Sequence, residues 1–300
     1  MKINEWLTKN TASLKGKTVA VTGTTGGLGR ELCRYLARLG ASIVLMDRNA
    51  ERSSAFRSEL EAEFGVSVSC INIDLEDIMS VKRATSSLLE LPVDVFIHNA
   101  GAYDIPRHKT SIGYDNVFQI NFISPYYIIR TLLPSLRERG GRAVIVSSIA
   151  HNYSKIDVED IDFSTRKASS KVYGNAKRYL TFSLYELFRG ESEASLAVTH
   201  PGISLTGITA HYPKLIFAII KYPMKVIFMS PKKACLSILR GVFKKTEYCR
   251  WIGPRLFDVW GLPKNKKLDT CKAREREQIF EIAERIYKEI SRGGEENGKY

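Results

Sequence analysis

Short apolar runs alternate with amphipathic segments along the first half of the chain. Each apolar run has the length of a strand, and the segments between them repeat apolar residues at helical spacing. Strands are predicted at 18–21, 42–46, 66–71 and 93–97, and helices from the glycine-rich turn to 39, over 50–64 and over 77–89. Strands that alternate with helices build a parallel sheet covered on both faces. The predicted fold class is therefore α/β, with a doubly wound parallel sheet.

The alternation continues in the second half and then becomes less regular. The further predicted elements are a helix over 116–136, a strand over 143–146, a helix over 171–188, a strand over 195–199, a helix over 231–243, a strand over 250–252, a loop over 253–267, a helix over 272–291 and a disordered tail over 293–300. Residues 203–230 break the pattern, because prolines separate their apolar runs. The sequence shows no internal repeat and no second domain, so a single domain over 1–300 is predicted.

The composition is that of an intracellular globular protein. Hydrophobic residues make up 44% of the 300 residues, which is enough for a full core. The five cysteines lack Cys-x-x-Cys spacing, which favours free thiols over a disulfide framework or a zinc site. The histidines lack metal-ligand spacing as well, and no metal is expected. Without a signal peptide or the roughly 20 apolar residues that span a bilayer, a soluble cytoplasmic protein is expected.

The formal net charge of +13 is compatible with nucleic acid, an acidic membrane surface or anionic ligands. The basic residues are scattered, however, with short clusters only at 232–233, 244–245 and 264–267. A basic, soluble surface is therefore favoured, and no nucleic-acid partner is expected. Lysines flank the apolar runs of 203–230, so peripheral contact with an anionic membrane is an alternative to packing against the rest of the chain or an oligomer contact there.

A glycine-rich turn lies between the first strand and the first long helix, the context in which such glycines hold a dinucleotide. Gly23 can adopt a tight turn, Gly27 lets backbone approach a pyrophosphate, and Gly29 permits close packing of helix on strand. The helix N-terminus then offers N–H groups to phosphates. A turn without a ligand is the alternative. The candidate cofactor-binding residues here are Thr22, Gly23, Thr25, Gly27, Leu28 and Gly29.

Asp47 and Arg48 make opposite predictions about the cofactor. A carboxylate at the end of the second strand accepts hydrogen bonds from ribose hydroxyls and repels a 2′-phosphate. The following arginine attracts that phosphate. NAD is favoured over NADP, because Asp47 is placed where the ribose is expected.

Polar and small residues also follow the third and fourth strands. Asp74 and Leu75 come after the third strand, and Asn99, Ala100 and Gly101 after the fourth. Ligands bind outside the carboxyl ends of strands in open α/β sheets, so these are candidate cofactor contacts. A turn or helix cap explains Asp74 equally well.

Two polar residues in the middle of the chain are candidates for the reaction. Pro125 has no N–H for the carbonyl of Asn121, four residues earlier, so a kink that frees this carbonyl for a water is predicted. Ser148 follows a buried strand and can donate to a carbonyl oxygen above the sheet. An ordinary kink and a helix cap are the respective alternatives.

Tyr173 and Lys177 are four residues apart in a predicted helix, which puts them on one face, one turn apart. An ammonium beside a phenol favours the phenolate, so the pKa of Tyr173 is expected to fall from about 10 toward neutrality. Such a tyrosine serves as general acid or base.

Taken together, these motifs resemble the short-chain dehydrogenases/reductases of the classical type. The motifs that carry the resemblance, in chain order, are Thr22-Gly-x-x-x-Gly27-x-Gly29, Asn99-Ala-Gly101, Asn121, Ser148, Tyr173-x-x-x-Lys177 and His200-Pro201-Gly202. The resemblance implies a Rossmann fold in which residues 15–205 form the cofactor and catalytic core and 203–230 a substrate lid. Each motif is weak alone, but the set is specific.

The resemblance also implies a role for each residue. Tyr173 would be the general acid/base, and Lys177 would bind the nicotinamide ribose and lower the pKa of Tyr173. Ser148 would orient the substrate, and Asn121 would hold a proton-relay water through its main chain. Further contacts to the nicotinamide side of the cofactor are implied for Pro201, Gly202, Ile203 and Thr206.

The chain departs from the family pattern at two places. His98 replaces the first asparagine of the usual Asn-Asn-Ala-Gly, a change expected to be tolerated. The segment 151–170 resembles an insertion of the branch that holds retinol dehydrogenases and WW-domain oxidoreductases. That branch often prefers NADP, and it has Cys-Arg at the positions that Asp47 and Arg48 occupy in this chain.

An NAD(P)-dependent oxidoreductase is therefore predicted. The apolar lid indicates an apolar alcohol, ketone or aldehyde, such as a retinoid, steroid or lipid-like molecule. The family implies a homodimer or homotetramer. The alternative function is a catalytically silent NAD(P)-binding regulator or scaffold.

Overall fold

An eight-stranded sheet forms the centre of the computed structural model, which describes residues 3–202 and 229–292. The strand order is β3-β2-β1-β4-β5-β6-β7-β8, and every neighbouring pair is parallel except the antiparallel β7–β8 pair. The strands are β1 (Thr18–Thr22), β2 (Ser42–Asp47), β3 (Val68–Asn72), β4 (Val93–His98), β5 (Arg142–Val146), β6 (Ser195–Thr199), β7 (Arg250–Leu256) and β8 (Trp260–Lys267). The predicted doubly wound parallel sheet is confirmed.

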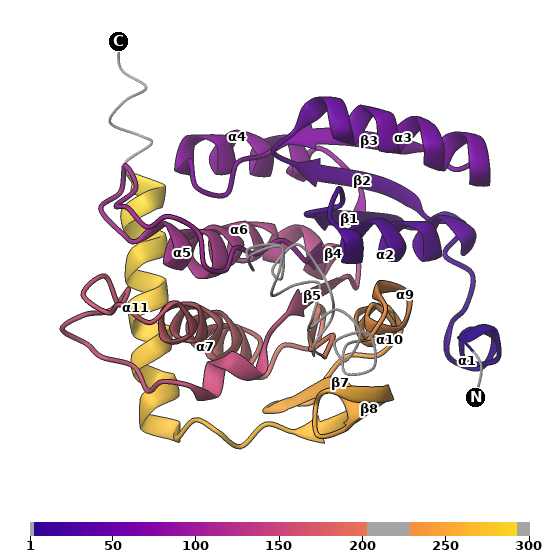
Figure 1. The fold of residues 1–300 in the computed structure, drawn as a ribbon. Helices are drawn as coiled ribbons and strands as arrows, with labels where there is room; N and C mark the ends of the chain where they lie inside the picture. The colour runs from indigo at the N-terminus through magenta and orange to yellow at the C-terminus, as the bar shows by residue number, and fades with distance from the viewer. Residues whose placement is uncertain (1–2, 203–228, 293–300) are drawn as a thin grey trace, which may run out of the picture.

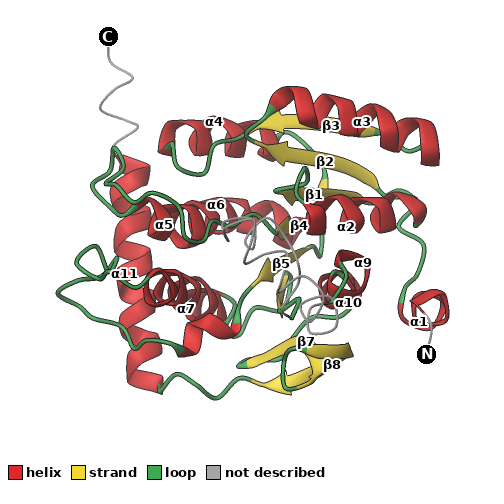
Figure 2. Ribbon diagram, in the orientation of Figure 1, coloured by secondary structure: helices red, strands yellow, loops and turns green. Residues whose placement is uncertain are grey.

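Helices cover both faces of this sheet (Figures 1 and 2). One core layer contains buried side chains of α1 (Ile3–Asn10), α2 (Gly27–Arg38), α3 (Ala50–Phe64) and α10 (Leu236–Phe243). The other layer contains those of α4 (Ile78–Leu89), η1 (Gln119–Ile123), α6 (Ser124–Glu138), α7 (Ser169–Leu187) and α11 (Ala273–Arg292). The described residues also include the short segments α5 (Asn116–Phe118), η2 (Ile149–Asn152) and α9 (Pro231–Ala234).

The long helix predicted over 116–136 is divided into three segments. Asp115 caps its start by accepting from the backbone N–H groups of Val117 and Phe118. The π-helical turn η1 follows and contains Asn121, before α6 continues with Pro125 in its first turn. The irregular turn thus includes Asn121, the residue whose carbonyl Pro125 cannot bond, and overlaps the segment 121–125 in which the proline predicted a break.

The loop predicted over 253–267 is wrong, because these residues form most of the β7–β8 hairpin. Gly253 and Pro254 were poor strand signals, and the turn lacks the glycine that normally marks a tight hairpin. The predicted helix over 231–243 is also divided, at Cys235 between α9 and α10.

The order of the strands reverses between β1 and β4, so the loops after these strands diverge at the carboxyl edge of the sheet. This switch point is the general ligand site of open α/β sheets. Within residues 3–202 and 229–292, no helix is long and apolar enough to cross a membrane. Residues 203–228 of the predicted lid, which include Ile203 and Thr206, lie outside the described residues. The predicted tail over 293–300 lies outside them as well.

Candidate active site

The glycine turn after β1 requires glycine at two positions for steric reasons. Gly23 has a φ of +71°, and a Cβ there would lie 2.8 Å from the Cα of Ala100. A Cβ on Gly29 would collide with the carbonyl oxygen of Gly23, so helix α2 packs against the turn only because this position is bare. At Gly27 a Cβ would meet nothing nearer than 3.9 Å. This position is open, as a backbone that receives a phosphate must be.

The loop after β4 is tied to the same turn. The Asn99 side-chain amide donates to the carbonyl oxygens of Thr22 (3.1 Å) and Gly23 (3.0 Å). The Thr22 hydroxyl in turn accepts from the backbone N–H groups of Asn99 and Ala100, each at 3.1 Å. The Asn99 Oδ1 atom is buried without a hydrogen-bond partner among the described residues. An open glycine cradle beside an unused acceptor fits a dinucleotide, so the residues present are compatible with the cofactor.

Asp47 connects the end of β2 to the glycine turn. Its carboxylate is buried and accepts from the Thr24 hydroxyl, from the Thr25 N–H and hydroxyl at 3.1 and 3.2 Å, and from the Ser53 hydroxyl at 3.1 Å. Neither Thr24 nor Ser53 was predicted, because a hydroxyl has no distinctive spacing in sequence. Arg48 is exposed to solvent. The carboxylate thus shapes the turn from within while Arg48 faces outward.

Asp74 and Leu75 serve the chain itself in this structure. The Asp74 carboxylate accepts from the Glu76 N–H at 3.0 Å, which is the turn alternative. The Leu75 carbonyl accepts from the Ser124 hydroxyl at 2.6 Å and so links the loop after β3 to helix α6. Both residues nevertheless lie at the carboxyl edge of the sheet, where they were predicted.

Asn121 reaches from the π-helical turn to the loop after β4. Its amide donates to the carbonyl oxygens of Ala102 and Val117, both at 2.8 Å, and its Oδ1 accepts from the Ala102 N–H at 3.3 Å. A Cβ on Gly101 would lie 2.9 Å from that Oδ1 and 3.6 Å from the Lys177 Nζ. Gly101 is therefore the point at which Asn121 and Lys177 converge.

Tyr173 lies half-buried near the start of α7. Its ring packs edge-on against Tyr103, with centroids 5.4 Å apart, and rests on the apolar cluster of Val117, Phe163 and Val172. Burial raises the pKa of Tyr173 to about 12, against the effect of a hydrogen bond with the Ser148 side chain, which lowers it. The Ser148 hydroxyl also accepts from the Ala150 N–H at 3.2 Å, so this serine is a cap of η2 as well as a partner of the tyrosine.

Lys177 is almost completely buried one turn further along α7. Its ammonium lies 5.6 Å from the ring centroid of Tyr173 and donates to the Val146 carbonyl oxygen at 3.0 Å. Burial lowers the pKa of Lys177 to about 7. The expected lowering of the Tyr173 pKa by Lys177 is therefore wrong for this structure. Desolvation of the phenol dominates, and the lysine is only partly charged near neutral pH.

His98, which replaces the family asparagine, is buried beside this group. Its Nδ1 lies 3.1 Å from the Thr22 hydroxyl, and its Nε2 has no partner among the described residues. Burial and then the charge of Lys177 hold the pKa of His98 well below its usual range. The ring is therefore neutral at physiological pH and adds no charge beside Lys177.

A buried ion pair links helix α7 to helix α11. The Arg178 guanidinium, adjacent to Lys177 in sequence, makes two hydrogen bonds of 2.7 Å to the Glu275 carboxylate on α11. It also donates to the carbonyl oxygens of His151 (3.1 Å) and Thr270 (2.8 Å). The His151 Nδ1 lies 2.6 Å from the Ser148 carbonyl oxygen, so this network reaches the serine. Sequence reasoning missed Arg178 and Glu275, because nothing local in the sequence connects positions 97 residues apart.

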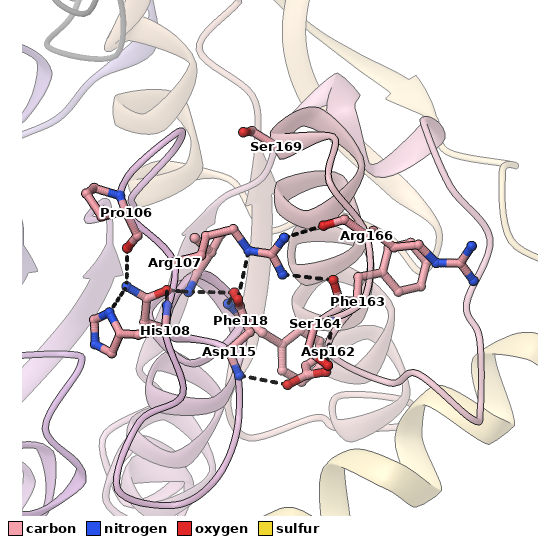
Figure 3. A network of polar contacts seen from close by, with 12 residues as sticks. Pro106, Arg107, His108, Asp115, Phe118, Asp162, Phe163, Ser164, Arg166 and Ser169 are labelled. Carbon is pink, nitrogen blue, oxygen red and sulfur yellow. Dashed lines mark hydrogen bonds and ion pairs between the residues drawn. The ribbon is translucent and has the colours of Figure 1, made fainter.

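A second network holds the 151–170 segment against the loop before α5 (Figure 3). Arg107 pairs with the Asp115 carboxylate at 2.8 Å and donates to the carbonyl oxygens of Phe163, at 2.8 Å, and Arg166. The Asp115 N–H donates to the Asp162 carboxylate at 2.7 Å. Phe163, whose carbonyl oxygen belongs to this network, lies in the apolar cluster that supports Tyr173.

We expect Arg107→Met to lower the free energy of unfolding by about 2–3 kcal/mol, because it leaves the Asp115 carboxylate buried without its cation. Urea denaturation followed by far-UV circular dichroism measures this. Arg83→Met is the matched control, since Arg83 is 69% exposed and lies 3.8 Å from Asp77. A change of less than about 0.5 kcal/mol is expected for it. Equal stability of the two variants would contradict the role given to Arg107.

Pro201 and Gly202 follow β6 at the same edge of the sheet. Gly202 has a φ of +81°, and a Cβ there would lie 2.7 Å from both the Met229 Cε and the Val259 carbonyl oxygen. The β7–β8 turn therefore packs directly on the residues that end β6. Within the described residues, no three His, Cys, Asp or Glu side chains gather closely enough to hold a metal ion.

Comparison with known proteins agrees with this geometry. A family model described as short chain dehydrogenase matches residues 17–159. Retinol dehydrogenase 13 from Homo sapiens is 30% identical over 207 residues, which cover 67% of this chain and 62% of that protein. The chain thus spans less than two thirds of that relative's length.

Solved structures show the same fold. One is an uncharacterized protein from Mycobacterium paratuberculosis, with a TM-score of 0.70 at 23% identity, covering 95% of this chain and 96% of that one. Another is a short-chain dehydrogenase from Sphingobium yanoikuyae in complex with NADPH, with a TM-score of 0.60 at 22% identity, covering 75% and 83%. With the glycine cradle and the Ser148–Tyr173–Lys177 group in place, the chain belongs to the short-chain dehydrogenase/reductase superfamily.

Proposed function

We propose that this protein is an NAD(P)-dependent oxidoreductase that interconverts apolar alcohols with the corresponding ketones or aldehydes. The observation that carries the proposal is the convergence of Ser148, Tyr173, Lys177 and Asn121 beside the glycine cradle, at the carboxyl edge of one sheet. The nicotinamide, when bound, supplies or accepts the hydride. The protein supplies orientation and the proton.

In this proposal, Tyr173 holds the proton that is exchanged with the substrate oxygen. Its hydroxyl shares a hydrogen bond with the Ser148 side chain, so both groups are directed at one point, where a carbonyl oxygen would receive two donors. Lys177 lies one turn away and would contact the nicotinamide ribose, as the family motif implies. Asn121 holds the loop after β4 in place through Ala102.

The protonation state of Tyr173 makes the rates of the two reaction directions depend differently on pH. With a pKa raised to about 12 by burial, the side chain is a neutral phenol at pH 7 and is ready to donate a proton to a carbonyl oxygen. Alcohol oxidation needs the phenolate, whose fraction grows as the pH rises toward that pKa. The rate of carbonyl reduction should therefore hold at neutral pH, and the rate of alcohol oxidation should rise under alkaline conditions.

For the cofactor, we propose NAD rather than NADP. The buried Asp47 carboxylate lies at the end of β2, where a 2′-phosphate would meet like charge. A solved structure of similar fold holds NADPH, and Arg48 is the residue through which this chain would hold a 2′-phosphate.

Nicotinamide fluorescence titration should show NADH binding at least about tenfold more tightly than NADPH, because two like charges held close together in a partly buried site repel strongly. Asp47→Asn should reduce this preference by about tenfold, since it removes the charge and keeps an acceptor oxygen for the Thr25 N–H. Asp77→Asn is the matched control and should leave the ratio unchanged, because Asp77 is an exposed N-cap of α4 that asparagine replaces well. A wild-type preference for NADPH that Arg48→Gln abolishes would overturn the assignment of NAD.

The apolar character of the substrate is supported by the surroundings of Tyr173. Ile105, Phe163 and Val172 pack together beside its ring. A named retinol dehydrogenase is among the relatives, and retinol is an apolar alcohol. A homodimer or homotetramer and a cytoplasmic location stay predictions. The rival function, a catalytically silent NAD(P)-binding scaffold, requires that none of these side chains take part in turnover.

A further inference from the structure

The turn between β7 and β8 exposes large apolar side chains to solvent. Leu256 is 52% exposed, Phe257 92% and Trp260 40%, and among the described large apolar residues Phe257 is the most exposed. Leu256 and Trp260 are cross-strand partners in the ladder, so their side chains project from the same face of the hairpin. Soluble monomers rarely expose several large apolar side chains together at one site, as these three residues are at the tip.

The backbone of the turn adds to the cost. Phe257 and Asp258 have φ values of 50° and 57°, and the Val259 N–H donates to the Leu256 carbonyl oxygen at 3.0 Å. Three residues, 257–259, join Leu256 to its cross-strand partner Trp260, and the first two of them lie in the left-handed region, which favours glycine and asparagine. A phenylalanine there is strained as well as unfavourably solvated. Such a conformational outlier points to a function for the side chain.

The turn is nevertheless firmly held. The Lys266 ammonium lies 2.9 Å from the Asp258 carboxylate, and the His200 Nε2 lies 2.9 Å from the Asp258 carbonyl oxygen. The Val259 carbonyl oxygen packs against Gly202. Phe257 is thus presented by a fixed support next to the end of β6.

Two cations without carboxylate partners among the described residues, Lys233 and Arg255, lie beside the apolar tip. The hairpin segment 250–267 carries five basic residues. Three of them are paired with carboxylates, namely Arg250 with Glu247, Lys266 with Asp258 and Lys267 with Asp269. Among the described residues, Arg255 and Lys264 have no such partner. A hollow of about 390 Å³ beside the tip is lined by two cations, Lys233 and Arg255, and otherwise by small or apolar residues. Within the described residues, neither cation is paired with a carboxylate. The other residues that line the hollow are Leu256, Gly261 and Leu262.

We propose that the β7–β8 tip docks on a bilayer that contains anionic lipids. Leu256, Phe257 and Trp260 enter the boundary between headgroups and acyl chains, where an indole ring is particularly well accommodated. Lys233 and Arg255 hold a lipid phosphate in the hollow beside them. Charge decides between this occupant and an apolar protein surface, because an anionic headgroup layer complements the two cations of the hollow, Lys233 and Arg255. The docking does not depend on the reaction proposed above.

The test is co-sedimentation of the full chain with vesicles of phosphatidylcholine containing roughly 30% phosphatidylserine, compared with phosphatidylcholine alone. The chain should partition onto the anionic vesicles and much less onto the neutral ones. Phe257→Asn should reduce this partitioning by about tenfold, because it removes the most deeply inserted ring. Arg255→Ser and Lys233→Ser should each reduce it by about fivefold.

Two matched controls distinguish binding through the tip from non-specific adsorption to vesicles. Leu89→Ser removes an apolar residue that is 42% exposed at the end of α4, and Arg52→Ser removes an exposed cation on α3. Neither should change vesicle binding. Phe257→Asn cannot lose binding through unfolding, since asparagine suits the left-handed region better than phenylalanine, and its thermal midpoint should be unchanged or higher.

Equal vesicle binding by Phe257→Asn and the wild type would overturn the proposal. So would sedimentation velocity in which Phe257→Asn abolishes a dimer while vesicle binding is unaffected, because the tip would then be a contact between copies of this chain. Loss of vesicle binding in the Phe257 and Arg255 variants, with both controls unaffected, would support it.

Discussion

Replacing Tyr173 by phenylalanine should lower kcat by about 10³-fold while the dissociation constant for the nicotinamide cofactor changes less than about twofold. The variant removes one hydroxyl and keeps the ring, which continues to pack on Tyr103 and on the cluster around Phe163. The losses are the proton that passes to or from the substrate oxygen and the hydrogen bond with the Ser148 side chain. Steady-state rates with an apolar aldehyde, together with fluorescence titration of the cofactor, measure the two quantities separately.

Tyr153→Phe is the matched control for this experiment. Tyr153 follows η2 and is 51% exposed, so loss of its hydroxyl should leave kcat unchanged. Unaffected turnover in Tyr173→Phe would refute the proposed mechanism. Absence of turnover in the wild-type protein with normal cofactor binding would instead favour the silent scaffold.

Removing the Glu275 side chain should cost about 3–5 kcal/mol of unfolding free energy, because Glu275→Ala leaves the Arg178 guanidinium buried without a counter-ion. Arg178 is only 3% exposed, and its remaining acceptors are backbone carbonyls. Urea denaturation at neutral pH measures the loss. Glu281→Ala on the exposed side of α11 is the control, with an expected change within about 0.5 kcal/mol.

The same ion pair predicts a dependence of stability on pH. Burial raises the pKa of Glu275, but the hydrogen bonds and charge of Arg178 outweigh it, and the pKa is lowered from 4.5. The contribution is therefore present above pH 4.5 and is lost as the pH falls through the lowered folded-state pKa. Glu275→Ala should show less acid destabilisation than the wild type in this window. An unchanged acid profile would mean that other carboxyl groups dominate it.

How far sequence reasoning reached depended on how local each signal was. The strands β1, β2 and β4 and helix α3 were predicted within one or two residues, because apolar runs and helical periodicity are properties of a few neighbouring positions. The glycine turn was equally accessible, since strand, glycines and helix follow one another directly. Tyr173 and Lys177 share a helical face, as their spacing required.

Features that depend on tertiary contact were not accessible. The pKa of Tyr173 was expected to fall because a lysine lies one turn away. It rises instead, because the phenol is buried, and burial cannot be judged from spacing. Asp47 was predicted as a ribose ligand, and its bonds to Thr24 and Ser53 were missed. The β7–β8 hairpin was predicted as a loop, since its turn breaks the usual residue preferences.

Strand β8 also has a consequence for self-association. A parallel sheet that ended at β7 would present a row of free backbone groups, onto which a strand of another molecule could add. Here β8 covers that row, and β8 itself carries Lys264, Lys266 and Lys267 together with Pro263, which has no N–H to offer. Lysine and proline are the residues by which natural edge strands discourage such addition. Two copies of this chain are therefore not expected to join their sheets across this edge, and any stable oligomer should form through other surfaces.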